Sequence, residues 1–279
     1  MTTHPPLADL PAFRHPPVTE ALLSVQFAPL AKLQSAHIGL LWNQLRSEYP
    51  SVSEQPPFNP TFETFGGPPQ VWQPRIELLQ SRPLPRFSFE AADNERFLQL
   101  QQDRIIHYWR KYGEEQDYPR YPELRRRFEH EIDVFSAFLA REGIEQLMPN
   151  QCEMTYTNIV AAPDGINPHR DLGRITTLWT TRPIGSDLGE LEDATIQARF
   201  VLRTDGEPVG RTYVQLVPHF LLPDLRPVLR FEITARGRPK VGTIASALEF
   251  LDMAHEAAVR TFDAVTTPEM HELWGKMDA

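Results

Sequence analysis

The stretch VTEALLSVQF, residues 18–27, alternates apolar and polar side chains, and so does CEMTYTNIV, residues 152–160. Strict alternation predicts a β-strand with one buried face. Each stretch is followed by further alternating runs, and each series ends in one long segment with apolar residues at helical spacing. We therefore predict an α+β fold of two related halves, each a curved antiparallel sheet backed by a long amphipathic helix.

The same patterns divide the chain of 279 residues into three parts. Residues 1–17 are rich in proline, which fixes φ and donates no hydrogen bond, so we expect an extended Pro-rich arm. Residues 18–150 are expected to form the first α+β half, and residues 151–279 the second. A chain of this length buries enough surface to fold without disulfides or metals.

Two long helices are predicted most clearly. The first starts at Tyr121-Pro122, because proline is favoured in the first turn of a helix, and is expected to end at Gly143. The second runs from about Ser246 to Val265. Both carry an apolar stripe that should cover a sheet.

Shorter signals complete the predicted secondary structure. Ser35 is expected to cap a helix, and Thr267-Pro268 to start a short terminal helix. Residues 50–74 are predicted to be a long irregular loop. Residues 96–109 are predicted to be one strand, with polar groups on both of its faces. Asp205-Gly206 predicts a β-hairpin.

Composition limits the classes of function. The net charge of −9 argues against non-specific nucleic-acid binding, which requires Lys and Arg to neutralise phosphates. Cys152 is the only cysteine, and its place in an apolar-patterned strand predicts a buried, inert thiol. No secretory signal and no long apolar run are seen, so we expect a cytoplasmic protein without a membrane partner.

Two partial catalytic motifs fail on their spacing. His169-Arg170-Asp171-Leu172 copies the start of a kinase catalytic loop, but Thr176 stands where the motif needs Asn. His255-Glu256 begins a zincin pattern, but Val259 replaces its second histidine. We therefore expect His255 to be a helix histidine with a hydrogen-bonded neighbour. No phosphate loop, dinucleotide fingerprint or nucleophile elbow occurs, so we predict no metal site and no cofactor.

One polar cluster remains as a candidate ligand site. Two strands rich in hydrogen-bonding and aromatic groups could line a cleft between the halves. The predicted ligand-binding residues are Arg104, Tyr108, Trp109, Arg110, Glu153, Tyr156 and Asn158. The alternative is a hydrogen-bond network that fixes the packing of the two halves, because buried polar groups must be satisfied in any case.

Several of these segments resemble an uncharacterised bacterial family described as "sporadically distributed" proteins of about this length. The similar segments are residues 17–21 (PVTEA), 98–110, 118–121 (YPRY), 153–158 (EMTYTN) and 254–275. The resemblance covers nearly the whole chain. It implies no particular activity, and the patchy distribution of the family suggests a place among defence, toxin–antitoxin or mobile-element genes.

Three functions are compatible with these observations. We favour a non-catalytic binding module for a protein partner or a small ligand. The second is a hydrolase or transferase in which the fold brings together Glu153, His169 and Asp171, with the histidine moving a proton. The third is a structural protein that forms a homodimer through exposed sheet edges or the proline-rich arm.

Overall fold

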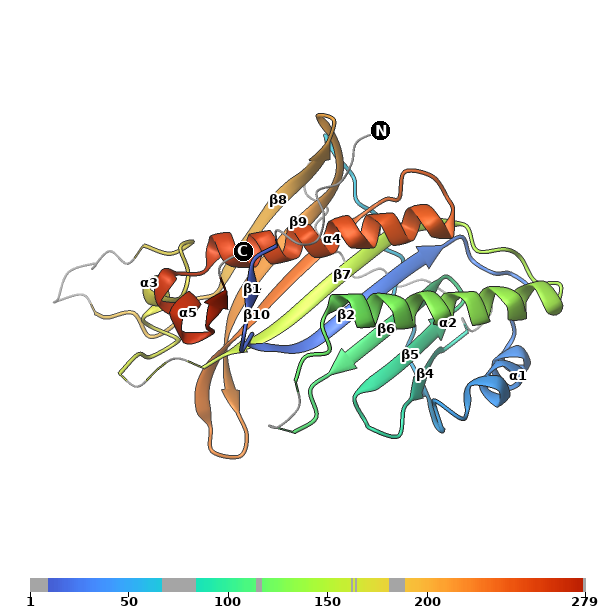
Figure 1. Ribbon diagram of the computed structural model, residues 1–279, viewed down its shortest axis with the longest axis horizontal. Coiled ribbons are helices and arrows are strands. Elements are labelled where there is room, and N and C mark those ends of the chain that lie inside the picture. Colours follow the sequence, from blue (N-terminus) through green and yellow to red (C-terminus); the bar gives the residue numbers. More distant parts are fainter. Residues whose placement is uncertain are drawn as a thin grey trace.

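The computed structural model describes residues 10–66, 84–113, 117–161, 163, 165–180 and 189–277. These residues form an α+β fold, as predicted, built on one open antiparallel sheet in the order β3-β4-β5-β6-β2-β7-β10-β9-β8 (Figure 1). Its strands are β2 (Val18–Phe27), β3 (Ser51–Gln55), β4 (Arg86–Glu90), β5 (Arg96–Gln101), β6 (Arg104–Arg110), β7 (Pro149–Val160), β8 (Ile196–Thr204), β9 (Glu207–Leu221) and β10 (Arg226–Gly237).

The sequence predicted one sheet for each half, whereas the strands before and after residue 150 form a single sheet. The reason is that β2 pairs antiparallel with β7 in the middle of the sheet, over the register Ala21 with Tyr156 to Gln26 with Gln151. On the outer sides, β2 pairs with β6 and β7 pairs with β10.

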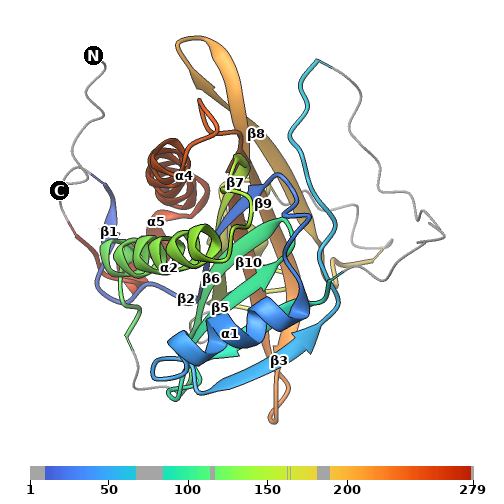
Figure 2. The same ribbon diagram turned by 90° about the vertical axis from the view of Figure 1, so that its right-hand side faces the viewer.

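The helices cover one face of this sheet. The two long helices lie side by side across it (Figures 1 and 2). The helices are α1 (Ser35–Leu45), α2 (Tyr121–Arg141), α3 (Leu172–Ile175), α4 (Ile244–Val265) and α5 (Pro268–Leu273). No helix in the described part of the chain is long and apolar enough to cross a membrane.

The core lies between the sheet and the two long helices. Alternation directs Leu23 and Met154 from the central strands toward the helices. They belong to one buried cluster with Phe128 and Phe135 of α2 and Leu251 of α4, all at most 1 % exposed. Burying each such side chain contributes roughly 1.5–3 kcal/mol relative to leaving it exposed, so the contacts on this face contribute strongly to stability.

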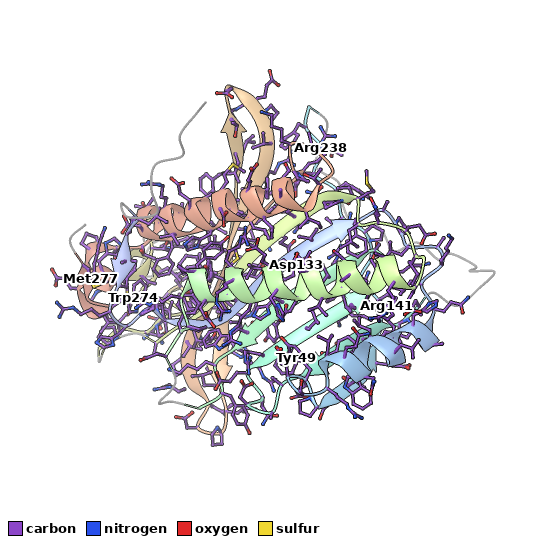
Figure 3. All side chains as sticks on the ribbon, turned by 45° about the vertical axis from the view of Figure 1, so that its right-hand side comes forward. Tyr49, Asp133, Arg141, Arg238, Trp274 and Met277 are labelled. Carbon is purple, nitrogen blue, oxygen red and sulfur yellow. The ribbon has the colours of Figure 1, made fainter. Side chains whose placement is uncertain are left out.

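A buried polar group also attaches α2 to the sheet. The Glu131 carboxylate of α2 lies 2.9 Å from Nδ1 of His107 on β6, and the Tyr49 hydroxyl donates to the same carboxylate. Burial first, and then the nearby Glu131 charge, raise the pKa of Tyr49. Tyr49 is labelled in Figure 3, below α2. These partners satisfy a carboxylate that is only 3 % exposed.

Most predicted helix ends are confirmed. Pro122 lies in the first turn of α2, and Gly143, with φ 65°, follows its end. The Thr267 side chain accepts a hydrogen bond from the backbone of Met270 and caps α5. The prediction for Ser35 is wrong by one position, because Ser35 is already helical and Gln34 is the N-cap.

The single strand predicted for residues 96–109 is wrong. The chain turns back at Gln102 and Asp103, so β5 and β6 form a two-residue hairpin with Gln101 opposite Arg104. The turn has no glycine, asparagine or proline, and its two carbonyls accept instead from the backbone of Phe27 and Leu30. This turn reverses the alternation, which explains why neither face of a single strand would be apolar.

The predicted hairpin at Asp205-Gly206 is confirmed, since both residues have positive φ between β8 and β9. The predicted loop 50–74 is correct only in part. Residues 51–55 form β3, residues 56–66 are irregular, and residues 67–74 lie outside the described residues. In the arm, β1 (Ala12–Phe13) pairs with β11 (Lys276–Met277).

Candidate functional site

A cavity of about 230 Å³ lies on the helix side of the sheet. The start of α2, the middle of α4, the two strands β7 and β10, and the β1 segment enclose it. Apolar side chains form most of its wall, among them Phe13, Val18, Ile233, Ala258, Val259 and Phe262. A largely apolar concavity with a few convergent polar groups is the usual form of a small-molecule site.

Local structure explains why polar groups converge on this cavity. In β7, Tyr156 and Asn158 are two residues apart, so both side chains point to the helix face. In α4, His255 lies on the same stripe as Ala258 and Phe262, which are three and seven residues further on. Tyr118 comes from the segment that leads into α2.

A chain of hydrogen bonds forms the polar side of the cavity. The hydroxyls of Tyr118 and Tyr156 are 3.0 Å apart, and the Tyr156 hydroxyl lies 2.9 Å from Nδ1 of His255. The His255 ring stacks on Tyr121, with ring centroids 3.9 Å apart and an angle of 8° between the planes. The Tyr121 hydroxyl donates to Oδ1 of Asp252 at 2.6 Å, which fixes its ring.

Tyr118, Tyr156 and His255 are neutral at pH 7. Burial lowers the pKa of His255 to about 4. Burial also raises the pKa values of Tyr118 and Tyr156 above that of an exposed tyrosine. A neutral imidazole and two phenol groups both donate and accept hydrogen bonds, so they can bind a polar group of a ligand without an ion pair.

Arg120 marks the entrance of the cavity. It has φ 66° and ψ 151°, a region that non-glycine residues rarely adopt and that costs about 1–3 kcal/mol. Its guanidinium donates to the carbonyl of Phe13 at 3.0 Å and so connects the start of α2 to β1. Strained residues of this kind cluster at functional sites.

A second, more polar cavity of about 540 Å³ adjoins the first. The two share Pro16, Val18, Tyr118 and Arg120 as lining residues. The outer cavity adds the cationic side chains of Arg14 and Lys111 and the acidic Asp117. We call it the vestibule. Its wall is basic on balance, in a chain whose net charge is −9.

The structure divides the predicted ligand-binding residues between the two faces of the sheet. Tyr156 and Asn158 line the cavity, and Trp109 packs behind it with its ring 5.6 Å from that of Tyr118. The other four point to the face without helices, because they occupy the alternate positions of β6 and β7; these residues are Arg104, Tyr108, Arg110 and Glu153. In addition, β2 separates β6 from β7.

The candidate catalytic residues do not meet. Glu153 is bonded to Arg236 at 2.6 Å, whereas Nε2 of His169 lies 3.0 Å from the carbonyl of Val228. Arg236 and Val228 are eight residues apart on β10, about 26 Å at the rise of a strand. Asp171 accepts from the backbone of Asn167 in the same loop as His169. Proton transfer between Glu153 and His169 requires contact that this geometry does not provide.

Sequence reasoning missed part of the cavity. It did not select Tyr118, Arg120 or Tyr121 as site residues, although these belong to one short YPRY segment. His255 was expected only to have a hydrogen-bonded neighbour, and Tyr156 is that neighbour. A histidine within the apolar stripe of α4 was the available signal. Cys152 is buried, as predicted, and burial raises the pKa of its thiol.

The comparisons with known proteins add no family. A scan against models of protein families finds no match, and a search of curated proteins finds none either. Among the described residues, no three or more His, Cys, Asp or Glu side chains are grouped to hold a metal ion.

Proposed function

We propose that this protein is a non-catalytic binding module that takes a small ligand in the cavity between α2 and α4. The observation that carries the proposal is the combination of apolar walls with the Tyr118–Tyr156–His255 chain of hydrogen bonds. The apolar walls favour a hydrophobic ligand body, and the neutral polar chain orients it.

Cavity size and charge suggest the class of ligand. An apolar cavity of about 150 Å³ accommodates benzene, so a cavity of about 230 Å³ suits a larger ring or a short branched chain. The adjoining vestibule carries Arg14, Lys111 and Arg120 against Asp117. A ligand with an apolar body and one anionic end, such as an aromatic carboxylate, complements both parts.

We also propose that the chain consists of two related halves. The topology supports this, because β2 and β7 each pair with the last strand of the meander that follows, β6 and β10 respectively. A long helix, α2 or α4, comes next in each case. The cavity lies where these two helices approach the sheet. A cytoplasmic location and an association with defence or toxin–antitoxin genes belong to the same proposal and rest on the sequence alone.

Calorimetry with two probes tests the ligand site. 2-Naphthoate has a bicyclic apolar body and a carboxylate, and 2-naphthol is its neutral counterpart. We expect 2-naphthoate to bind with a Kd of about 1 mM or lower, and 2-naphthol to bind more weakly because it lacks the charge.

A matched pair of variants locates the binding. Ala258 is buried in the cavity wall, so Ala258→Trp should fill the cavity and abolish binding. Ala264 is exposed on the same helix, so Ala264→Trp should leave binding unchanged. The absence of saturable binding to the wild-type protein, or equal affinity in the two variants, would refute the proposed site.

A further inference from the structure

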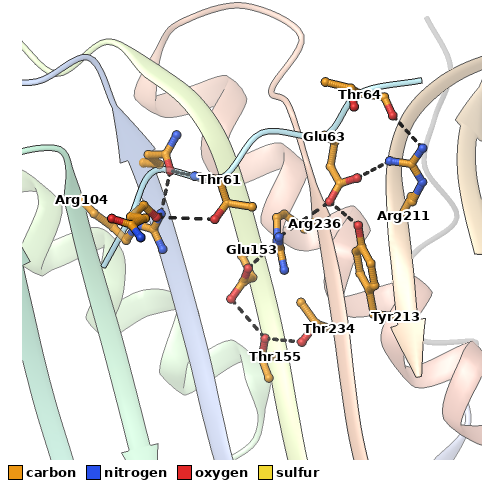
Figure 4. A network of polar contacts seen from close by, with 12 residues as sticks. Thr61, Glu63, Thr64, Arg104, Glu153, Thr155, Arg211, Tyr213, Thr234 and Arg236 are labelled. Atoms are coloured by element: carbon orange, nitrogen blue, oxygen red, sulfur yellow. Dashed lines mark hydrogen bonds and ion pairs between the residues drawn. The ribbon is translucent and has the colours of Figure 1, made fainter. Parts of the chain in front are cut away.

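An extended segment, residues 56–66, crosses the face of the sheet that lacks helices (Figures 2 and 4). We call it the strap. It follows β3 and forms no ladder with the strands beneath it. Some recognition domains bind extended, proline-containing peptides in a surface groove through side-chain contacts, without strand pairing.

Side chains of the sheet bind the backbone of the strap. The side-chain amide of Gln101 accepts a hydrogen bond from the backbone N–H of Phe58 and donates one to the backbone carbonyl of Phe58, each at 3.0 Å. The side-chain Oε1 of Gln26 accepts a hydrogen bond from the backbone N–H of Thr61 at 2.9 Å. The Arg211 guanidinium donates a hydrogen bond to the backbone carbonyl of Thr64 at 2.7 Å. Such bonds recognise an extended main chain whatever its side chains are.

One side chain of the strap, that of Glu63, is bound by specific polar contacts. The Glu63 carboxylate, 3 % exposed, is held by an ion pair with Arg211 and by the Tyr213 hydroxyl at 2.7 Å. Arg236 lies 3.8 Å away and also pairs with Glu153. Burial opposes the charge of Arg236, but the two glutamates raise its pKa. The network in Figure 4 is therefore a pocket for one acidic side chain.

Two aromatic rings flank this pocket. The guanidinium carbon of Arg86 lies 3.9 Å from the centroid of the Phe58 ring. The guanidinium carbon of Arg211 lies 4.5 Å from the centroid of the Phe65 ring. Stacking of arginine on aromatic rings adds attraction at each end of the segment. The recognised pattern is an aromatic residue, an acidic residue five positions later, and a second aromatic residue two positions after that.

The strap does not satisfy every group beneath it. Gln151, only 4 % exposed, has no hydrogen-bond partner for Nε2 among the described residues, and neither has Nε of Arg104. Both line a small polar cavity of about 10 Å³ next to Thr61. A groove whose buried polar groups stay unpaired can bind another chain more completely.

We propose that this face of the sheet is a recognition groove for an extended acidic peptide of a protein partner, and that the strap occupies it in the absence of the partner. The ligand is a peptide because the groove bonds main-chain groups of an extended segment. It is acidic because the pocket presents Arg211, Arg236 and Tyr213. The groove lies on the opposite face from the cavity, so this inference stands or falls independently of naphthoate binding.

The experiment measures fluorescence anisotropy of a labelled peptide with the sequence of residues 56–66, PPFNPTFETFG. In the wild-type protein the strap competes at an effective concentration in the millimolar range, so we expect weak binding. Glu63→Ala in the protein loosens the strap and should tighten peptide binding by about tenfold or more. A peptide with alanine in place of its glutamate should not bind.

Two further variants keep the test decisive. Thr61→Pro removes the N–H that donates to the side chain of Gln26, and also the Thr61 hydroxyl, whose hydrogen bond to the Asn59 carbonyl lies within the strap. It leaves the Glu63 pocket unchanged, so it loosens the strap even if Glu63→Ala fails to fold. Adding Arg211→Ala to either variant should reverse the gain. The proposal is overturned by folded variants that bind no peptide, by binding that ignores the glutamate of the peptide, or by strap variants that form dimers, which would assign the groove to a second copy.

Discussion

The two faces of the same sheet are built in opposite ways. On the helix side, the cavity is apolar and its polar groups are the neutral side chains of Tyr118, Tyr156 and His255. On the strap side, the central groups are charged and joined as ion pairs, with Glu63 between Arg211 and Arg236. Adjacent residues of one strand, such as Tyr156 and Thr155 of β7, face these two environments.

The difference follows from what covers each face. Two long helices exclude water, so an uncompensated charge would be costly there: burial favours the neutral forms of Tyr118, Tyr156 and His255, and the Glu131 carboxylate is held by His107 and Tyr49. A single extended strap leaves the Arg211 and Arg236 side chains about a fifth exposed, so these arginines stay partly hydrated, and the buried Glu63 carboxylate is compensated by pairing with them. We infer that the helix side suits a small hydrophobic ligand and the strap side an acidic chain.

The largest expected effect contrasts neighbouring residues of β10. Phe231→Ala empties a fully buried position on the helix side, where the ring stacks on Phe262, and should destabilise the fold by about 3–5 kcal/mol. Glu232→Ala breaks a partly exposed pair with Arg230 on the other face and should cost about 0–1 kcal/mol. Urea denaturation at pH 7 compares them; similar losses would remove the distinction between the faces.

An intermediate effect is a pH dependence from His255. Its pKa is about 4 in the folded protein and about 6.5 when unfolded, so the unfolded state binds more protons between these values. Stability is therefore lost as pH falls from about 6.5 toward 4, by about 2 kcal/mol between pH 7 and pH 5. The groups around the ring are Tyr156 on Nδ1 and Tyr121, itself bonded to Asp252.

The variant His255→Asn isolates this contribution from other titrating groups. We expect the difference in unfolding free energy between pH 7 and pH 5 to shrink by about 2 kcal/mol relative to the wild type. An unchanged difference would mean that the imidazole is protonated inside the folded protein, and that the helix side tolerates charge.

The smallest effect comes from a single hydroxyl. Tyr156→Phe removes the group that joins Tyr118 to His255 and should cost about 1 kcal/mol of stability. It should also weaken 2-naphthoate binding in calorimetry, since the polar chain is interrupted. Full affinity in this variant would show that the apolar walls alone bind the probe.

Local patterns in the sequence predicted much of the fold. The helices α2 and α4 carry long, largely apolar stripes, and the Asp205-Gly206 turn has residues suited to positive φ. The turn at Gln102 and Asp103 was missed because distant backbone groups, those of Phe27 and Leu30, stabilise it. Local sequence carries no trace of such partners.

The candidate site was predictable only in part for the same reason. Tyr156 and Asn158 follow from the alternation of β7, but their meeting with His255 depends on where α4 lies over the sheet. Arg104 and Glu153 were grouped with them, although alternation sends these two to the strap side. Strand order, which inserts β2 between β6 and β7, decides that outcome.

The most direct test of the proposed ligand site is a crystal structure of the protein with 2-naphthoate. We predict the naphthalene ring against Ala258 and Phe262, with its carboxylate directed to Tyr118 or Arg120 at the vestibule. An empty cavity at a naphthoate concentration that saturates the calorimetric signal, or naphthoate bound on the strap side, would contradict the assignment.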